Sequence, residues 1–139
     1  MTSDTLWTCP DCGRQFARKG QSHACVIYTP EEHLEKATPA AQAMYAAFYA
    51  LVEKCGEFFI EATKTSIAFK TPRLLAAIAF HKQGINITFW LPHPLADPRI
   101  HKVYDTGSDY AHHLRVRSLD EIDAQIQNWL CEAYLFASQ

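Results

Sequence analysis

The sequence predicts an α+β domain, an antiparallel sheet of four to six strands with two long helices on one face, plus a small N-terminal zinc-binding module. Three observations predict it. Cys9 and Cys12 form a Cys-x-x-Cys pair near the start, two stretches have helical periodicity, and the chain between those stretches is rich in branched and aromatic residues. With 139 residues, the chain has room for a module over 1–28 and a domain over 29–139.

The cysteine-rich start predicts a structural zinc site. A segment this short cannot bury enough apolar surface to fold alone, and zinc supplies the missing stability when four ligands surround it as a tetrahedron. His33 is an alternative ligand, but Thr29-Pro30-Glu31-Glu32 is typical of a helix start and would place His33 on that helix. The preferred ligands are Cys9, Cys12, His23 and Cys25.

The first long helix is predicted from Pro39 to Cys55, between the N-cap Thr38 and Gly56. Cys55 continues its buried stripe, so we interpret this thiol as a core residue and not as a nucleophile. The other residues of the stripe are Met44, Ala47, Phe48, Leu51 and Val52.

The second long helix is predicted from about Leu119 to Phe136, opening with a capping box of Ser118 and Glu121. Cys131 is interpreted as another small hydrophobic or partly exposed residue. The apolar face of this helix comprises Ile122, Ile126, Trp129, Leu130 and Ala133.

Six predicted strands lie between the helices, and the pair Gln83-Gly84 is typical of a hairpin turn between two of them. Because side chains alternate along a strand, one set of residues should face the helices. The strands are 58–62, 66–71, 74–82, 85–91, 100–106 and 110–117. The inward set is Ile67, Phe69, Leu74, Ile78, Phe80, Ile85, Ile87, Phe89, Leu91, Leu114 and Val116.

The opposite face of the sheet should carry small, aromatic and cationic side chains. Cations suit a phosphate or carboxylate, and an indole stacks on a flat ring, so this face is a candidate ligand surface. In the alternative interpretation, the cations are solvated and Trp90 packs under the zinc module. The outward set is Ser66, Ala68, Lys70, Ala77, Ala79, His81, Asn86, Thr88, Trp90, His113, Arg115 and Arg117.

Alternation sends the neighbouring rings of His112 and His113 to opposite faces, so they cannot chelate one metal together. We expect His112 to be partly buried at the edge of the core and to be hydrogen-bonded. His113 is the candidate for acid–base chemistry.

Composition limits the classes of partner and compartment. The net charge is −2, so no whole-protein positive field attracts nucleic acid, and no apolar stretch approaches the length of a membrane span. Met1 to Leu6 is polar and acidic, unlike a signal peptide. We therefore expect a cytoplasmic protein with reduced thiols, in which five cysteines, an odd number, favour metal ligation over disulfides.

Two resemblances extend this interpretation. Trp7-x-Cys9-x-x-Cys12-x-x-x-Phe16 resembles the first half of a classical zinc finger, but Gly20, Ser22 and Cys25 depart from the second half. The whole chain resembles an uncharacterised bacterial domain family, sometimes labelled predicted transport proteins, whose related domains occur beside nuclease-like modules. The motifs that carry this are Trp-Thr-Cys-Pro-x-Cys-Gly-Arg-x-Phe-Ala-Arg at 7–18, Thr63-Lys64-Thr65-x-Ile67-Ala68-Phe69, Trp90-Leu91-Pro92 and His113-x-Arg115-x-Arg117-Ser118.

The resemblance implies an α+β domain with a zinc-ribbon-like extension and no established activity. Among its motif positions, Trp90, His113, Arg115 and Arg117 lie on the outward face, and Lys64 lies at its strand edge. The candidate ligand-binding residues are therefore Lys64, Lys70, Trp90, His113, Arg115 and Arg117.

Three functions remain open at this point. The preferred hypothesis is a non-enzymatic, zinc-stabilised binding domain whose basic-aromatic face recognises an anionic small molecule or a nucleic acid. The second is an enzyme acting on a phosphorylated or acyl substrate, with His113 as general base and with Lys64 and Arg115 holding charge. The third is an adaptor that docks a protein partner through the zinc module.

Overall fold

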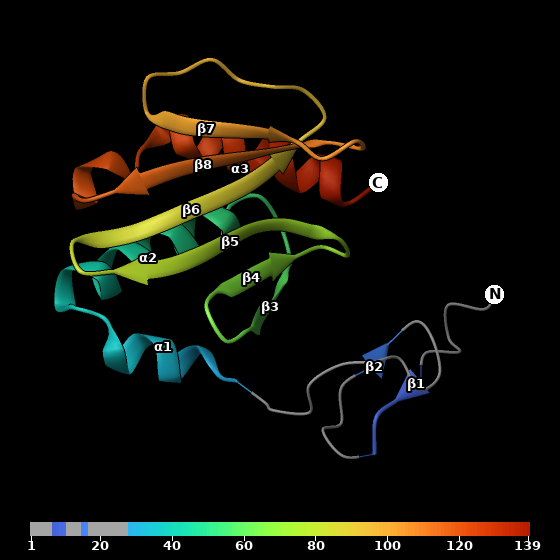
Figure 1. The fold of residues 1–139 in the computed structure, drawn as a ribbon, viewed down its shortest axis with the longest axis horizontal. Coiled ribbons are helices and arrows are strands. Elements are labelled where there is room, and N and C mark those ends of the chain that lie inside the picture. Colours follow the sequence, from blue (N-terminus) through green and yellow to red (C-terminus); the bar gives the residue numbers. More distant parts are fainter. Residues whose placement is uncertain (1–6, 11–14, 17–27) are drawn as a thin grey trace.

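The computed structural model describes residues 7–10, 15–16 and 28–139 (Figure 1). Its helices are α1 (Pro30–Lys36), α2 (Pro39–Glu53) and α3 (Ala124–Ala137). Its strands are β1 (Trp7–Thr8), β2 (Gln15–Phe16), β3 (Phe59–Ala62), β4 (Ile67–Lys70), β5 (Leu74–His81), β6 (Gly84–Leu91), β7 (Ile100–Asp105) and β8 (Tyr110–Val116). The predicted ligands Cys12, His23 and Cys25 lie outside the described residues.

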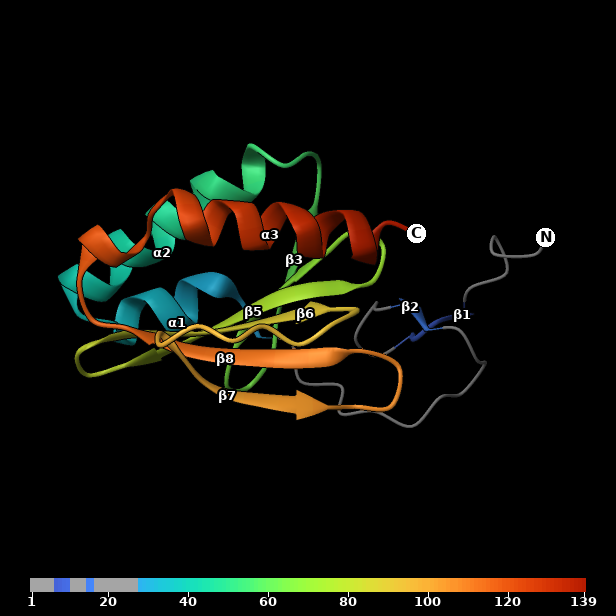
Figure 2. The ribbon, with the colours of Figure 1, turned by 90° about the horizontal axis from the view of Figure 1, so that it is seen from above.

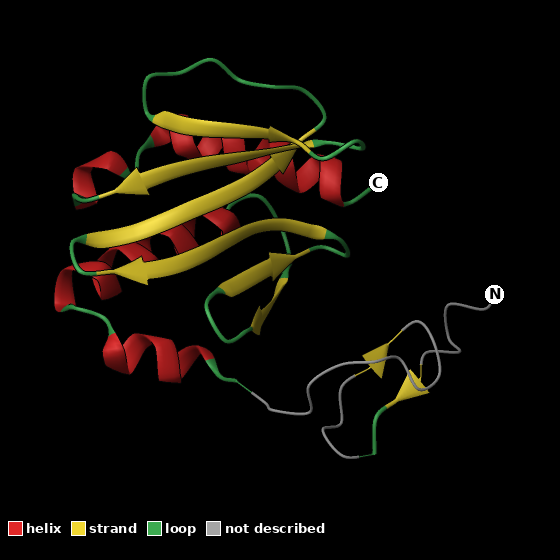
Figure 3. Ribbon diagram, in the orientation of Figure 1, coloured by secondary structure: helices red, strands yellow, loops and turns green. Residues whose placement is uncertain are grey.

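Strands β3 to β8 form a six-stranded antiparallel sheet in the order β3-β4-β5-β6-β8-β7. Both long helices, α2 and α3, lie on one face of this sheet (Figure 2). The predicted α+β class, the antiparallel sheet and the position of the two helices are confirmed. Figure 3 shows the strands of the six-stranded sheet as one layer in front of α2 and α3. The short strands β1 and β2 pair separately, Trp7 with Phe16.

The helix starts follow the capping signals of the sequence, with one exception. Thr29 caps α1 in a capping box with Glu32, and Thr38 caps α2 by accepting a hydrogen bond from the Ala41 amide. The predicted start of the last helix at Ser118 was wrong. Ser118 begins only a 3-10 turn, and α3 starts after Asp123, whose side chain accepts from the Ile126 amide.

A disulfide joins Cys55, just after α2, to Cys131 on α3, with Cα atoms 5.1 Å apart. This contradicts the interpretation of the two residues as unpaired small hydrophobes. The two helices pack against each other, which brings together positions 76 residues apart in the sequence. The disulfide also contradicts the expectation that the thiols are reduced, because Cys55 and Cys131 are oxidised to a disulfide. The cytoplasmic location stays a prediction.

The core lies between the sheet and the two long helices, and it contains nearly all of the inward set. Leu74 is the exception: this side chain is 37% exposed, whereas its neighbour Leu75 is fully buried. The reason is a register shift at the end of β4, where Lys70 pairs with Leu74 instead of Leu75. Such a bulge changes which side chain of the strand faces the core.

The hairpin between β5 and β6 turns at Lys82 and Gln83, one residue earlier than predicted, and Gly84 is the first residue of β6. A Cβ atom on Gly84 would lie 2.0 Å from the carbonyl oxygen of Val116. Glycine is therefore required here by the close approach of β8 rather than by the turn.

Candidate functional site

The strand register confirms the outward face predicted from alternation. Thr88 on β6 pairs with His113 on β8, which pairs in turn with Lys102 on β7. One row along the strands, Asn86 pairs with Arg115. In the described part of the chain, none of the outward positions of β6, β8 and β7 carries a carboxylate. They are Asn86, Thr88, Trp90, Ala111, His113, Arg115, Lys102 and Tyr104.

His113 lies in the middle of this face, half-buried. Its Nδ1 atom lies 3.0 Å from the Thr88 hydroxyl oxygen. Burial lowers the pKa of His113, and the nearby charges of His101 and Lys102 lower it further. The Tyr104 ring packs edge-on against the imidazole with centroids 5.1 Å apart, and Lys102 lies over that tyrosine ring. His113 thus lies beside two basic side chains, those of His101 and Lys102, and one aromatic ring.

Arg115 and Arg117 are both exposed at the other end of β8. The Arg115 Nε atom donates to the Asn86 side-chain oxygen at 3.2 Å, which fixes the stem of the guanidinium and leaves its terminal nitrogens for other acceptors. Both arginines act on His81 at the end of β5. Burial lowers the pKa of His81 first, then the charge of Arg115 and, more weakly, that of Arg117.

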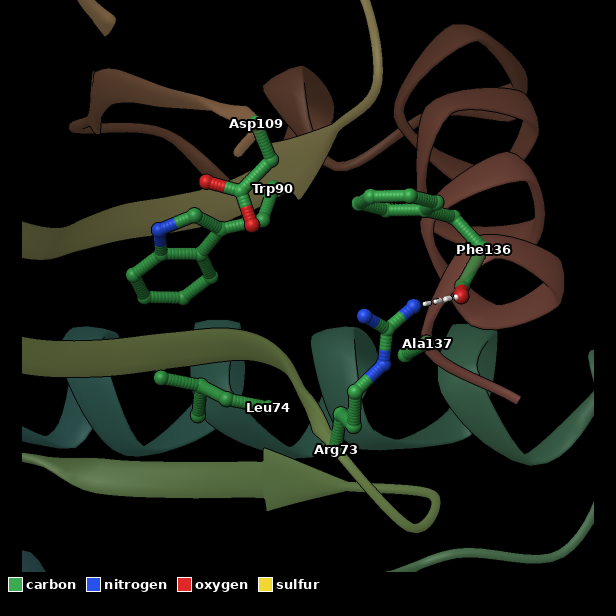
Figure 4. Close-up of a pocket in the computed structure, with 6 residues that line it drawn as sticks. All are labelled: Arg73, Leu74, Trp90, Asp109, Phe136 and Ala137. Atoms are coloured by element: carbon green, nitrogen blue, oxygen red, sulfur yellow. Dashed lines mark hydrogen bonds between the residues drawn. The ribbon is translucent and has the colours of Figure 1, made fainter. Parts of the chain in front are cut away.

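The basic and aromatic residues on the outer side of β7 and β8 are named the outer cluster: His101, Lys102, Tyr104, His113, Arg115 and Arg117. Lys70 and Trp90 do not belong to this cluster. Lys70 forms an ion pair with Glu61 at 2.8 Å, so its charge is already compensated. Trp90 lines a small cavity of about 160 Å³ at the end of the sheet. In Figure 4, Arg73 extends toward Phe136 of α3 and donates to its carbonyl oxygen, and Asp109 lies beside the indole.

Lys64 lies at the opposite end of β5 from the Trp90 cavity. It lines a cavity of about 560 Å³ between α1, the β3–β4 turn and the β5–β6 hairpin. Since β5 runs for eight residues, the two cavities are separated by roughly 20 Å, too far for one small ligand to contact both. The structure therefore divides the six predicted ligand-binding residues among an outer cluster, two cavities and an ion pair.

His112 points to the opposite face from His113, as predicted, and is fully buried. Its Nε2 atom accepts from the Leu95 amide at 3.0 Å, and its ring stacks on Phe89 at 4.9 Å. Burial is the main cause of a lowered pKa. His112 therefore anchors the loop before β7 and takes no part in the outer face.

Sequence reasoning missed the contribution of β7 to the outer face, namely His101, Lys102 and Tyr104. The same alternation rule would have placed Lys102 and Tyr104 there. The bulge between Ile100 and Lys102 places His101 beside His113, and no periodic pattern predicts it.

Residues 31–137, which include the sheet, both long helices and the outer cluster, match a family described as a domain of unknown function, DUF5655. The chain belongs to this family. The expected resemblance to a family of unknown function is thereby confirmed for the DUF5655 domain. The zinc-ribbon-like extension stays a prediction, and nothing here bears on the transport label. No curated protein matches the chain, and no solved structure does.

The zinc site also stays a prediction. Among residues 7–10, 15–16 and 28–139, no three His, Cys, Asp or Glu side chains lie close enough to hold a metal ion. Cys9, the predicted ligand within these ranges, is buried. His33, the alternative ligand, lies on α1, and its Nε2 atom is 2.7 Å from the Thr63 carbonyl oxygen. Within the same ranges, no helix is long and apolar enough to cross a bilayer.

Proposed function

We propose that the DUF5655 domain is a non-enzymatic binding domain whose outer face recognises single-stranded nucleic acid. The observation that carries this is the outer cluster, defined as His101, Lys102, Tyr104, His113, Arg115 and Arg117. It combines cations for phosphates with an exposed tyrosine ring for stacking. Among the described residues, the outward positions of β6, β8 and β7 carry no carboxylate, and the Glu121 carboxylate accepts a hydrogen bond from the Arg117 amide at the end of the cluster. Because the outer cluster extends across neighbouring strands instead of surrounding a cavity, it suits an extended polyanion.

Local charge decides the electrostatics here in spite of the net charge of −2. Salt screens exposed charges beyond about 8–10 Å, so acidic residues on the helical side act weakly on this face. Arg115 is held by Asn86 at its Nε atom, which orients the guanidinium toward solvent at little further entropic cost.

The test is fluorescence anisotropy of a labelled 15-nucleotide poly(U) RNA, with Arg115→Gln and Lys102→Gln as variants. Each should weaken binding about three- to tenfold and lower the dependence of log K on log salt by about 0.7 for each phosphate that the variant no longer neutralises. Lys54→Gln, at the exposed end of α2, is the matched control. Wild-type affinity in both face variants would overturn the proposal, and uridine monophosphate binding as tightly as the oligomer would assign the face to a small anion.

The enzyme hypothesis has one observation in its favour, the contact between the Thr88 hydroxyl and His113 Nδ1. A hydroxyl–imidazole pair of this kind can serve in nucleophilic catalysis when a third group orients the imidazole. Among the described residues, the groups that act on His113 are His101 and Lys102, which are cationic or neutral, and not a carboxylate. The binding function is therefore preferred. The adaptor hypothesis depends on residues that lie largely outside the described ranges.

A further inference from the structure

The cavity beside Lys64 differs from the outer face in shape and in lining. Its volume of about 560 Å³ is within the range of small-molecule sites. Five side chains with basic nitrogens line it, together with Phe80 and the chain between α1 and α2, and its lining contains no carboxylate in the described part of the protein. The five are His33, Lys36, Lys64, His81 and Lys82.

The three lysines of the cavity have no ion-pair partner within the described ranges, unlike Lys70, which pairs with Glu61. Composition does not force this arrangement, because 15 acidic residues outnumber 13 lysines and arginines in the chain. Helix α1 separates its charges: His33 and Lys36 line this cavity, whereas Glu31 and Glu35 line a different one beside Tyr45 and Tyr49. Like charges gathered in a concave site favour an anion that compensates them.

The walls of the cavity are fixed by hydrogen bonds. The β3–β4 turn that carries Lys64 is closed by Thr63 and Ser66, whose backbone atoms bond at 2.8 Å, and His33 ties Thr63 to α1. On the other side, the Gln42 side chain donates to the Leu34 and Ala37 carbonyls and holds the α1–α2 connection. This connection ends at Thr38, the N-cap of the 15-residue helix α2, where the helix dipole favours negative charge.

His81 supplies a further observation. Its Nδ1 atom accepts from the Gln83 amide at 3.1 Å, so the neutral ring carries its proton on Nε2. That Nε2 atom is buried and has no partner within hydrogen-bonding distance and angle among the described residues. A backbone contact with Ile85 raises the pKa of His81 and offsets part of the lowering caused by burial and by Arg115. A buried donor without an acceptor costs free energy, which an anionic oxygen could recover after a small side-chain movement.

We propose that this cavity is a binding site for a small phosphate compound carrying two or more negative charges. Ammonium groups and a helix N-terminus are common partners of phosphate, and the Phe80 ring offers an apolar wall for the rest of such a molecule. The site lies at the His81 end of β5, and its lining includes no residue of the outer cluster. Arg115 and Arg117 lie close enough to His81 to lower its pKa and add positive potential at this end of the cavity. The proposal does not depend on the proposed nucleic-acid function.

The test is calorimetric titration of the full chain with inorganic pyrophosphate at physiological salt, with Lys64→Gln and Lys82→Gln as cavity variants. Each should weaken binding about five- to tenfold. Lys54→Gln and Lys70→Gln are controls that remove a lysine outside both the cavity and the outer cluster, and they should leave the affinity unchanged. Lys102→Gln tests whether the outer cluster binds the same anion. Thermal unfolding of every variant establishes that the fold is intact.

Amide NMR shifts during the same titration locate the site, and we expect them at Thr65 and Lys82 but not at Thr88 or His113. Three results would overturn the proposal: no binding by wild type, equal weakening in Lys102→Gln, or citrate binding as tightly as pyrophosphate. RNA binding that fails while pyrophosphate still binds would refute only the outer-face function, and the reverse result would refute only this site.

Discussion

At the scale of single residues, the environments of four histidines move their pKa values in opposite directions. Burial is the main cause of lowered values at His81, His112 and His113, whereas the hydrogen bond to Glu132 is the main cause of a raised value at His93. Because the pKa of each of these three residues is lower in the folded state, the unfolded chain binds a proton at a higher pH than the folded chain does. Their contribution to the stability of the fold is therefore present above about pH 6.5 and is lost as the pH falls through the folded-state values.

His93 has the opposite sign. Its raised pKa means that its contact with Glu132 stabilises the folded state fully below about pH 6.5, and that this contribution disappears as pH rises through the folded-state value. In Glu132→Gln, we expect the pKa of His93 to fall, measured by NMR titration of the imidazole protons. The His113 titration is the control and should not move. An unchanged His93 pKa would contradict the contact.

Glycine is favoured at positions 84 and 107 for different physical reasons. We expect Gly84→Ala to lower the free energy of unfolding by more than about 2 kcal/mol, because its Cβ would collide with the β8 backbone. Gly107→Ala should cost about 1 kcal/mol, because its Cβ meets nothing within 4 Å and only its φ of +99° is unfavourable. Urea unfolding of both variants measures the difference, and equal losses would contradict the close approach at Gly84.

At the scale of elements, the start of α3 offers a direct comparison between sequence and structure. We expect Asp123→Ala to lower the free energy of unfolding by about 1 kcal/mol, because Asp123 caps α3 and also pairs with Arg99 at 3.2 Å. Ser118→Ala should cost only a few tenths of a kcal/mol, since Ser118 caps a single 3-10 turn. A larger loss in Ser118→Ala than in Asp123→Ala would favour one continuous helix from 119.

The bulge in β5 gives a second comparison. Leu75→Ala should cost about 2–4 kcal/mol, because it removes a fully buried side chain from the core. Leu74→Ala should cost less than about 1 kcal/mol, because this residue is exposed at the edge of the Trp90 cavity. Thermal unfolding distinguishes the two, and the reverse ranking would restore the register expected from simple alternation.

Most of the elements could be predicted because each has a local cause in the sequence. Alternation found β6 and β8 and their outward residues, and Thr38 with Pro39 marked the start of α2. The three errors have causes outside the local sequence. Leu74 and Gly84 are placed by a neighbouring strand, and Ser118 does not start α3 because Asp123 caps that helix instead. The candidate site was predicted only in part: Arg115 and His113 share a strand, but the α1 residues that join Lys64 around its cavity belong to no common pattern.

At the scale of the whole molecule, the disulfide between Cys55 and Cys131 links the two long helices across 76 residues. A cross-link that closes a long loop restricts the unfolded chain and stabilises the fold by about 2–4 kcal/mol. We expect Cys131→Ser to lower the free energy of unfolding by this amount, measured by urea denaturation. Reduction of the wild type should give the same loss, and reductant should not affect the variant. Equal stability of the oxidised and reduced wild type would contradict the cross-link.

The same cross-link encloses every strand of the six-stranded sheet, because β3 begins after Cys55 and β8 ends before Cys131. Tension applied between the two ends of the chain would therefore pass from α2 through the sulfur atoms into α3 and bypass the sheet. The chain between Cys55 and Cys131 could not be extended until the bond was reduced, so a stretched molecule would extend in the segments outside this loop. Load would reach the strands only through the packing of α2 and α3 on β5 and β6. The basic outer face would thus keep its register in a protein pulled from both ends.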